Sequence, residues 1–558
     1  MSTSEAKTRT QARAVSGVEL SRGIGVQAAR GFWQDAWSQV IRRPSAVAGL
    51  VWVGVVAFFA VFAPFIASGY PLIERQLGAG GVVEGVSYPL FARLSASDVL
   101  LLLGAVAGVC WILVPARLPR SARLGAMFFG AFQAGITVIL VSLAAGAAGE
   151  RDAADWLRAM EKSPWFRETA CALIAAAVAV PFAALPLIPR RGLRLVVVTV
   201  VAVVSGTVCW STWSAQPTRF DSREREAAGE ISATYTLIPW SPNQRRTDLD
   251  LLRPGASYHS PEIRAIVRGR PDLVLDGAAI AGVIERVGDV RVPPAERPAL
   301  RGAVEAELSS LNTATVAEVR GVLNRHAGPW FRFGTDSLGQ DVLSQMLHAC
   351  RLSISIGLVS TTIAVLIGVT LGAMMGYFGG WTDMFLFRIV EIFMAVPVLF
   401  LLIVAAGLLP PQFRSTYVIM AIIGCFTWTG AARFIRAEFM RLRTQDFVQS
   451  ARAVGLPLRS VLFKHMLPNG VTPVLVDASF AIAVAILFES ILSFLGLGPP
   501  DQASWGRLLS DATNQVGQFV PHLAIAPGAA IFLTVLSFTL IGEALRDAID
   551  PKLKKARV

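Results

Sequence analysis

Long runs of apolar residues constrain this chain more than any other feature. Of its 558 residues, 54% are hydrophobic and 16% are charged, which is too apolar a mixture for a soluble globular protein. A helix that crosses a bilayer needs about 20 mostly apolar residues. About ten segments meet this length, at residues 46–67, 97–116, 124–146, 169–189, 193–212, 351–377, 385–408, 415–435, 472–496 and 523–544. The sequence therefore predicts an all-α polytopic membrane protein.

The positions of Lys and Arg predict how the chain is threaded. Cations gather in short cytoplasmic loops, and the clusters at residues 42–43, 117–123 and 190–194 share one side if the N-terminus is cytoplasmic. The same threading places the cations of residues 433–464 and of the tail inside. We expect an inner-membrane protein with both termini in the cytoplasm. The net charge of +12 then reflects membrane topology, and no basic run interleaved with aromatic residues points to nucleic acid.

Polar stretches divide the chain further. We expect a cytoplasmic tail at 1–45, a first span at 46–67 that is retained as an anchor, and four spans within 68–212. An extracytoplasmic region at 213–350, a second set of spans at 351–547 and a basic cytoplasmic tail at 548–558 follow. Pro and Gly punctuate residues 255–330. This segment fits either a small, mainly helical domain or an extended, partly disordered loop.

Signatures of enzymatic chemistry are missing from the sequence. No Gly-rich loop ends in Gly-Lys-Ser or Gly-Lys-Thr, so the chain lacks the phosphate-binding loop of a P-loop ATPase. The five histidines and five cysteines are scattered, without the spacing of a metal site or a disulfide framework. We expect no catalytic residues, no metal site and no cofactor bound by this chain.

The loop between the eighth and ninth predicted spans, within residues 438–470, carries the most information. Thr444 is a candidate N-cap, and Gly455 can adopt the left-handed conformation that ends a first short helix. Pro457 suits the first turn of a second helix, which Pro468-Asn469-Gly470 would end.

We predict that this loop folds into a helical hairpin at the membrane surface. Its small residues Ser450, Ala451 and Ala453 would let another protein approach closely, as a docking element requires. An ordinary amphipathic surface loop is the alternative.

Two further patterns lie inside apolar segments. Gly368, Gly372 and Gly376 recur every four residues on one helix face and predict close helix packing, whether static or sliding. Glu391 and Glu489 are ionisable groups within spans, where they are costly and so are candidates for pore or intramembrane roles. Glu391 has a nearby partner in Arg388, whereas Glu489 has no sequence-local one.

The predicted hairpin resembles the EAA loop of binding-protein-dependent ABC importer permeases. Gln449-Ser450-Ala451 stands where Glu-Ala-Ala is usual, and both the Gly and the Leu-Pro of the family loop are present. In that family the loop inserts into a groove of the ATPase. The coupling residues that this resemblance implies are Gln449, Ser450, Ala451, Arg452, Ala453, Gly455, Lys464, Leu467, Pro468 and Asn469.

Three other motifs resemble the C-type permease of dipeptide, oligopeptide and nickel importers. They are the stretch 333–344, similar to GTDxLGRD, the stretch 489–506, and the RDALDP-like ending at 546–551. The segment 238–243 is similar to the microcin C-type branch. The residues of the first motif that match are Gly334, Thr335, Asp336, Leu338, Gly339 and Asp341.

The resemblance implies a type I importer core of six helices, so the four spans within 68–212 would be an insertion of two hairpins. It also implies a second homologous permease, two cytoplasmic ATPases that hold ATP and Mg, and an extracytoplasmic binding protein. Peptides are the implied substrate, and nickel complexes or glutathione-like thiols are handled by related systems. An ion-coupled secondary transporter and a non-transporting membrane scaffold remain the alternatives.

Overall fold

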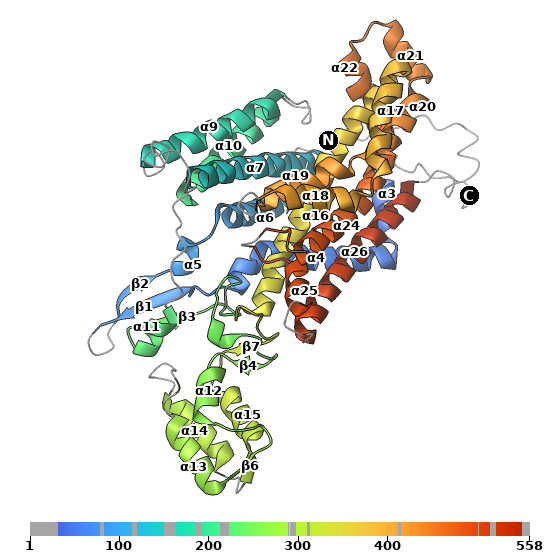
Figure 1. The fold of residues 1–558 in the computed structure, drawn as a ribbon. Coiled ribbons are helices and arrows are strands. Elements are labelled where there is room, and N and C mark those ends of the chain that lie inside the picture. Colours follow the sequence, from blue (N-terminus) through green and yellow to red (C-terminus); the bar gives the residue numbers. More distant parts are fainter. Residues whose placement is uncertain are drawn as a thin grey trace, which may run out of the picture.

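A computed structural model describes most of the chain. The described residues are 32–78, 83–113, 120–149, 163–184, 191–212, 222–287, 290, 297–309, 313–410, 414–499, 502–513 and 520–549. Figure 1 shows a mainly helical molecule with three small sheets at one end, which confirms the all-α membrane class. Residues 1–31 of the predicted N-terminal tail and residues 550–558 of the predicted C-terminal tail lie outside the described part.

The centre of the molecule is the 37-residue helix α16 (Val342–Phe378). It packs against α4 (Pro44–Ile66), α19 (Thr416–Thr427), α20 (Thr429–Leu442) and α24 (Thr472–Phe494). At 1.5 Å per residue α16 is about 55 Å long, and the hydrocarbon layer is about 30 Å thick. One or both ends of α16 therefore project beyond the bilayer.

Helix α26 (Pro521–Ile549) completes this core by packing on α4 and α24. An ion pair of 2.6 Å between Arg43 and Asp547 joins the start of α4 to the end of α26. The short helix α3 (Phe32–Ile41) precedes α4 and also contacts α26. The start of α4 and the end of α26 therefore lie at the same end of the bundle.

In the described part of the chain, seven helices are long and apolar enough to cross a membrane, and two bent pairs raise the number to nine. The tenth predicted segment, 97–116, ends in residues 114–116, which lie outside the described part. In this segment α6 (Ala96–Leu113) forms, but its apolar part, Ala96–Trp111, is shorter than a full span. The other predicted segments each coincide with a long helix or a bent pair.

Two predicted spans are bent helix pairs. α17 (Gly380–Ala395) and α18 (Val398–Leu408) meet at 82°, because Pro397 disfavours helical backbone at the residue before it, and Val396 is extended. α19 and α20 meet at 43°. Thr427 lies at that bend and donates its hydroxyl to the Ile423 carbonyl, a contact that commonly bends helices.

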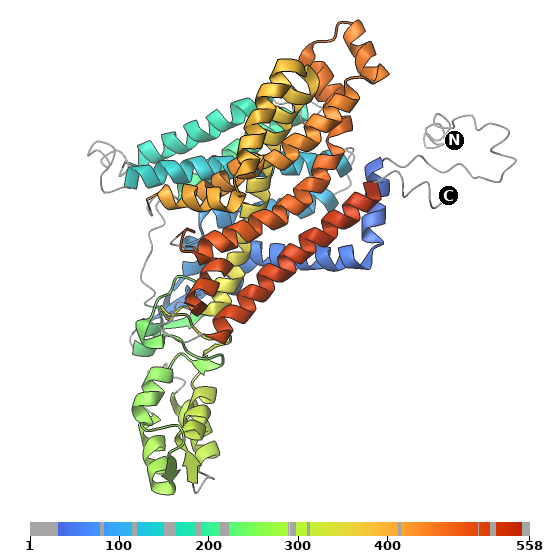
Figure 2. The same cartoon turned by 45° about the vertical axis from the view of Figure 1, so that its right-hand side comes forward.

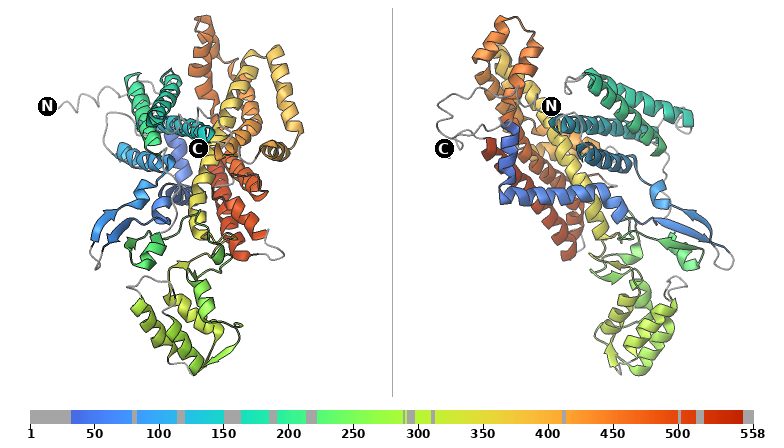
Figure 3. Two further views of the ribbon diagram at one scale, coloured as in Figure 1. Left: turned by 60° about the vertical axis from the view of Figure 1, so that its left-hand side comes forward. Right: turned by 180° about the vertical axis from the view of Figure 1, so that it is seen from behind.

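Residues 96–212 form a separate helical group beside the core (Figure 3). In it α7 (Arg120–Gly149), α9 (Pro164–Ala184) and α10 (Arg191–Thr212) pack on one another, and α6 contacts α7, α10 and α4. Asp98 of α6 forms an ion pair with Arg351 of α16, and Arg351 also donates to the Ala60 carbonyl of α4 at 3.1 Å. The group is thereby anchored on the two central helices.

The sheets lie at the end of the molecule where α16 and α26 begin, opposite the C-terminal ends of these two helices. β2 (Val83–Ser87), β1 (Ile73–Leu77) and β3 (Ile231–Thr234) form an antiparallel sheet in that order, flanked by the short helices α5 (Pro89–Ala92) and α11 (Ser222–Ala228). The pairs β4 (Ala256–Ser257) with β7 (Trp330–Phe331) and β5 (Val274–Asp276) with β6 (Thr313–Thr315) follow. A 3-10 turn, η1 (Thr247–Leu249), leads into them.

Residues 256–331 form a lobe that projects from this end (Figure 2). Its helices are α12 (Ser260–Ile266), α13 (Gly277–Arg286), α14 (Arg297–Leu308) and α15 (Val316–His326). Thr315 and Glu318 form a capping box at the start of α15. Val304, Leu308 and Val319 are fully buried in the lobe's own hydrophobic core. Of the two readings left open by the sequence, the structure has the small helical domain.

The three glycines of the predicted packing face lie against α20. A Cβ added to Gly368, Gly372 or Gly376 would come within 2.7, 2.5 and 2.6 Å of the carbonyl oxygens of Trp428, Ala432 and Arg436. The two backbones therefore touch along two turns, and no larger residue fits between them. We call this contact the glycine seam.

Gly372→Ala tests the glycine seam. The added methyl group would overlap the Ala432 carbonyl oxygen, and overpacking of this kind costs roughly 1–3 kcal/mol. We expect a lower Tm for the purified protein in detergent. Gly407→Ala is the matched control, because the space around Gly407 in α18 is open. Equal Tm values for the two variants would refute close packing at the seam.

Candidate functional site

A helical hairpin follows α20 at the far end of the bundle from the lobe (Figure 1). Its first arm is α21 (Asp446–Ala453), and the arm ends where Gly455 adopts a φ of +77°. The Leu456 N–H then donates to the Ala451 carbonyl at 3.2 Å, which closes the helix end. The left-handed glycine that the sequence predicts is present.

The predicted N-cap of the first arm is wrong. Gln445 occupies that position, and the Thr444 hydroxyl instead donates back to the Arg441 carbonyl at 2.9 Å. Thr444 therefore satisfies a free carbonyl at the end of α20 rather than a free N–H at the start of α21.

The second arm ends where the sequence predicts, at Gly470. It begins after Pro457 with α22 (Leu458–Ser460), continues through a π-helical turn (Val461–Met466) and passes through α23 (Leu467–Gly470) into α24. The sequence predicts that Pro468-Asn469-Gly470 ends this arm, and α23 does end at Gly470. In the wider turn just before Pro468, the Leu467 N–H pairs with the Leu462 carbonyl. This turn accommodates Pro468, which has no N–H to donate. One residue, Val471, separates α23 from α24, so the second arm leads directly into α24.

One face of the hairpin is used internally. Val448, Ala451, Val461 and Met466 pack against Phe439 and its neighbours on α20. Ala451 is only 7% exposed, so it supports the hairpin itself. The small residues that remain available to another protein are Ser450 and Ala453.

The other face of the hairpin is exposed and partly apolar. Val454 is 79% exposed and Phe463 is 63% exposed, and Leu456 and Leu458 accompany them at the turn. Of the other implied coupling residues, Leu467 is half-buried, and the Asn469 amide donates to the His465 carbonyl at 2.7 Å. The members of this set with exposed side chains are Gln449, Ser450, Arg452, Ala453, Gly455, Lys464, Pro468 and Asn469.

Contacts that the sequence did not suggest tie the hairpin region to the neighbouring helices. The Arg452 guanidinium lies 4.5 Å from the ring centre of Tyr377, in the last turns of α16. Arg436 of α20 pairs with Asp383 of α17 at 2.7 Å. The paired residues lie far apart in the chain, and no local pattern links them, so sequence reasoning could not find them.

The motif at residues 334–341 forms a turn at the start of α16. Thr335 is fully buried; its hydroxyl donates to the Leu249 carbonyl at 2.5 Å and accepts from the Leu252 N–H at 2.7 Å. Asp336 accepts from the N–H groups of Leu338 and Gln340 at 2.9 and 2.8 Å. These bonds hold the segment 246–252 against the turn.

Asp341 ends the motif as the N-cap of α16 and accepts from the Ser344 N–H at 2.7 Å. Burial raises the pKa of Asp341 to about 7 and also raises the pKa of Asp336. Gly334 and Gly339 have φ values of +79° and +69°, and both lie against neighbouring backbone carbonyls. The motif's residues therefore build the junction between α16 and the strands below it.

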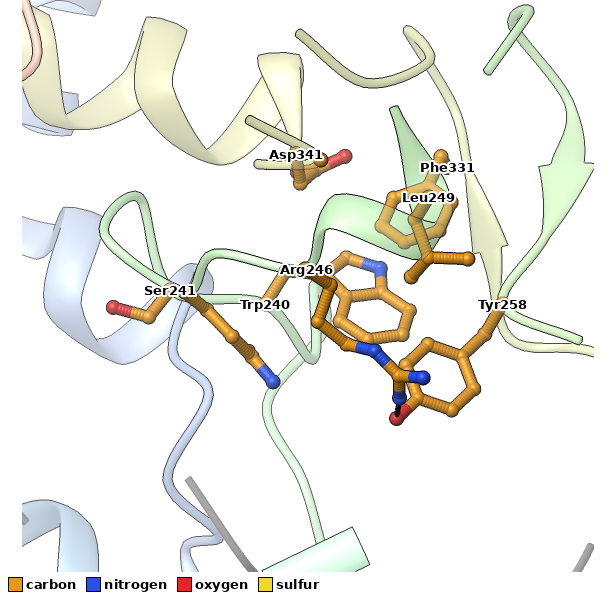
Figure 4. A pocket seen from close by; sticks show the side chains of 9 residues that line it. Trp240, Ser241, Arg246, Leu249, Tyr258, Phe331 and Asp341 are labelled. Atoms are coloured by element: carbon orange, nitrogen blue, oxygen red, sulfur yellow. Dashed lines mark hydrogen bonds between the residues drawn. The ribbon is translucent and has the colours of Figure 1, made fainter. Parts of the chain in front are cut away.

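A small pocket lies beside this junction (Figure 4). Trp240 stacks on Phe331 at 4.5 Å and on Tyr258 at 5.1 Å between ring centres, and Asp341 lies at the pocket's edge. Trp240 belongs to the segment 238–243, whose Ile238 pairs with the end of α4 through the Ile66 carbonyl at 2.8 Å. The segment thus links α4 to α16.

The two candidate glutamates have different surroundings. Glu391 is partly exposed and pairs with Arg388 at 2.6 Å. Glu489 is fully buried, and it accepts hydrogen bonds from Ser493 at 2.7 Å and from Ser504 at 2.8 Å. Because Ser504 precedes α25 (Trp505–Thr513), Glu489 fastens α25 to α24. Its side chain does not line an open path in this conformation.

Comparisons with known proteins agree with this architecture. Residues 368–555 match the family described as "Binding-protein-dependent transport system inner membrane component", and residues 31–78 match the "N-terminal TM domain of oligopeptide transport permease C". The two matched regions hold α4 and everything from the glycine seam onward. They leave out residues 79–367, which include the inserted helices and the lobe.

Curated relatives match over a similar share of the chain. The dipeptide transport system permease protein DppC of Alkalihalophilus pseudofirmus is 37% identical over 236 residues, which cover 41% of this chain and 76% of that protein. The oligopeptide transport system permease protein OppC of Haemophilus influenzae is 40% identical over 221 residues, covering 39% and 70%. The glutathione transport system permease protein GsiD of Pectobacterium atrosepticum is 39% identical over 222 residues, covering 40% and 72%.

These matches cover more than two thirds of each relative, and the core has one helical hairpin that joins two membrane helices. The chain therefore belongs to the family of binding-protein-dependent transport system inner membrane components, the permease subunits of ABC importers.

Proposed function

We propose that the hairpin at residues 444–470 docks into a separate ATPase subunit and transmits ATP-driven motion to the membrane helices. The observation that carries this proposal is the exposed apolar turn of the hairpin, centred on Val454 and Gly455. A rigid helical element with an exposed apolar face is suited to a groove in a partner protein. Phe463 and Leu458 extend the same surface.

The hairpin end of the molecule is the cytosolic one in this proposal, and both termini lie on that side. Cations gather there, among them Arg443, Arg452, Arg459 and Lys464, as the positive-inside rule requires. The ion pair between Arg43 and Asp547 supports the same placement for both ends of the chain. The lobe at residues 256–331 then faces the outside.

The working importer would contain more than this chain. We infer a second, homologous permease, two ATPase subunits that bind ATP and Mg, and a binding protein that docks on the outer side. Peptides or related small solutes are the proposed cargo, since the relatives are named for dipeptide, oligopeptide and glutathione transport. The coupling residues are those exposed on the hairpin.

Force applied at the hairpin would reach three core helices. α21 continues from α20, the second arm leads into α24, and Arg452 contacts α16 through Tyr377. Because the glycine seam holds α20 on α16, a shift of the hairpin would move α24 relative to these two helices. This arrangement explains how nucleotide hydrolysis in one protein changes the shape of another.

Gly455→Ala should uncouple ATP hydrolysis from uptake. An L-residue at a φ of +77° is strained by roughly 1–2 kcal/mol, enough to lower coupled uptake about tenfold. The measurement is solute uptake per ATP hydrolysed by the reconstituted importer. Gly496→Ala is the matched control, with a φ of +73° and open surroundings at the other end of α24. Normal coupling in Gly455→Ala would contradict the proposal.

Cysteine labelling tests the proposed orientation. In a chain whose native cysteines are replaced by Ser, we expect a membrane-impermeant maleimide to label Ser309→Cys in intact cells. Ser450→Cys should react only after the cells are opened, because it lies on the hairpin; both positions are exposed. Labelling of position 450 in intact cells would place the hairpin outside and end the proposal.

The contact between Arg452 and Tyr377 provides a test of force transmission. Tyr377→Ala removes the ring that the guanidinium covers, and such a contact contributes about 0.5–2 kcal/mol. We expect uptake to fall while the ATPase still co-purifies with the permease. Tyr377→Phe keeps the ring and should retain uptake. If Tyr377→Ala transports as well as Tyr377→Phe, then α16 does not receive force by this route.

A further inference from the structure

Two oppositely charged residues lie on facing helices of the core, and neither belongs to the hairpin or to the motifs above. Arg433 is in the second turn of α20, and Asp477 is in the second turn of α24. Arg433 is exposed and Asp477 is half-buried. Asp477 lies in α24, which is long and apolar enough to cross a membrane, where an ionised side chain is costly unless it faces water or a partner. Arg433 lies in α20, which is long and apolar enough only together with α19.

The geometry brings the two side chains to one face. A Cβ added to Gly430 would lie 3.4 Å from a carboxylate oxygen of Asp477, so this glycine lets the carboxylate lie against α20. Arg433 is three residues after Gly430 and therefore lies on the same side of α20. Its guanidinium acts electrostatically on Asp477.

The two charges do not neutralise each other in a close pair. Within the described part of the chain, the ion pairs shorter than 4.0 Å on α20 join Arg436 to Asp383 and Arg441 to Glu438, and Arg433 is in neither. Exposed apolar side chains, Phe434 and Leu475, flank the charged residues on the two helices. An exposed cation and an accessible carboxylate that remain apart can each bind a charge of opposite sign.

We propose that Arg433 and Asp477 line the solute path and bind the carboxylate and the ammonium group of a zwitterionic solute, such as a peptide with free termini. This inference rests on the proposed function. The two helices that carry the pair are the two that the hairpin joins. Movement of the hairpin therefore changes the separation of the charges, so that ATP-driven motion would release the solute.

The test uses the complete importer, with its ATPases, second permease and binding protein, reconstituted in liposomes. Uptake is measured for trialanine, for its N-acetyl form and for its C-terminal amide. Arg433→Gln should lower trialanine uptake about tenfold, as expected for loss of a hydrogen bond to a charged group, and should abolish the preference for the free carboxylate over the amide. Asp477→Asn should abolish the preference for the free amine over the N-acetyl form.

Arg301→Gln is the control, because it removes an exposed cation from α14 of the lobe, outside α20 and α24; its uptake should equal that of the unmodified protein. A purely structural role would lower the uptake of all three peptides equally, and that result would overturn the inference. Wild-type rates in Arg433→Gln and Asp477→Asn, or a wild-type importer that carries none of the three peptides, would overturn it as well. Co-purification of the ATPase tests the proposed function separately and should be unchanged in every variant.

Discussion

Close contact between the backbones of α16 and α20 is the constraint on which the rest of the core depends. Lipid provides no hydrophobic force between helices, so small residues that permit tight van der Waals contact decide where helices associate. Gly368, Gly372 and Gly376 supply that contact along two turns. Because α20 is fixed on α16 in this way, the hairpin that follows α20 stands in a defined position relative to the longest helix.

The hairpin is mechanically continuous with the bundle. Gly455 makes the one sharp reversal, and the π-helical turn before Pro468 lets the second arm run into α24. Flexible loops would absorb a push from a partner protein, whereas a helical connection transmits it. The same hairpin joins the two helices that carry Arg433 and Asp477, so the proposed force transmission and the proposed solute binding involve the same helices.

Much of this architecture could be predicted from the sequence, because it depends on local patterns. The length of the apolar segments predicted the membrane helices, and the spacing of the seam glycines predicted a packing face. Gly455 predicted the position where the hairpin reverses direction. Predictions for individual residues were wrong where contacts between distant segments determine the side-chain environment. Thr444 hydrogen-bonds to the end of the preceding helix, and Ala451 packs against α20 and is not available to a partner. The contacts of Arg452 with Tyr377 and of Arg351 with Asp98 join distant segments, and only the fold brings them together.

We propose above that the exposed turn of the hairpin contacts a nucleotide-hydrolysing partner in the cytosol. The most direct measurement places a photo-crosslinking amino acid at Ala453, which is exposed beside that turn, and irradiates intact cells. From this proposal we expect a covalent adduct between the permease and a P-loop ATPase, and no such adduct when the crosslinker is placed at Ser309 of the lobe. An ATPase adduct from the lobe, or none from position 453 in cells that carry out uptake, would contradict it.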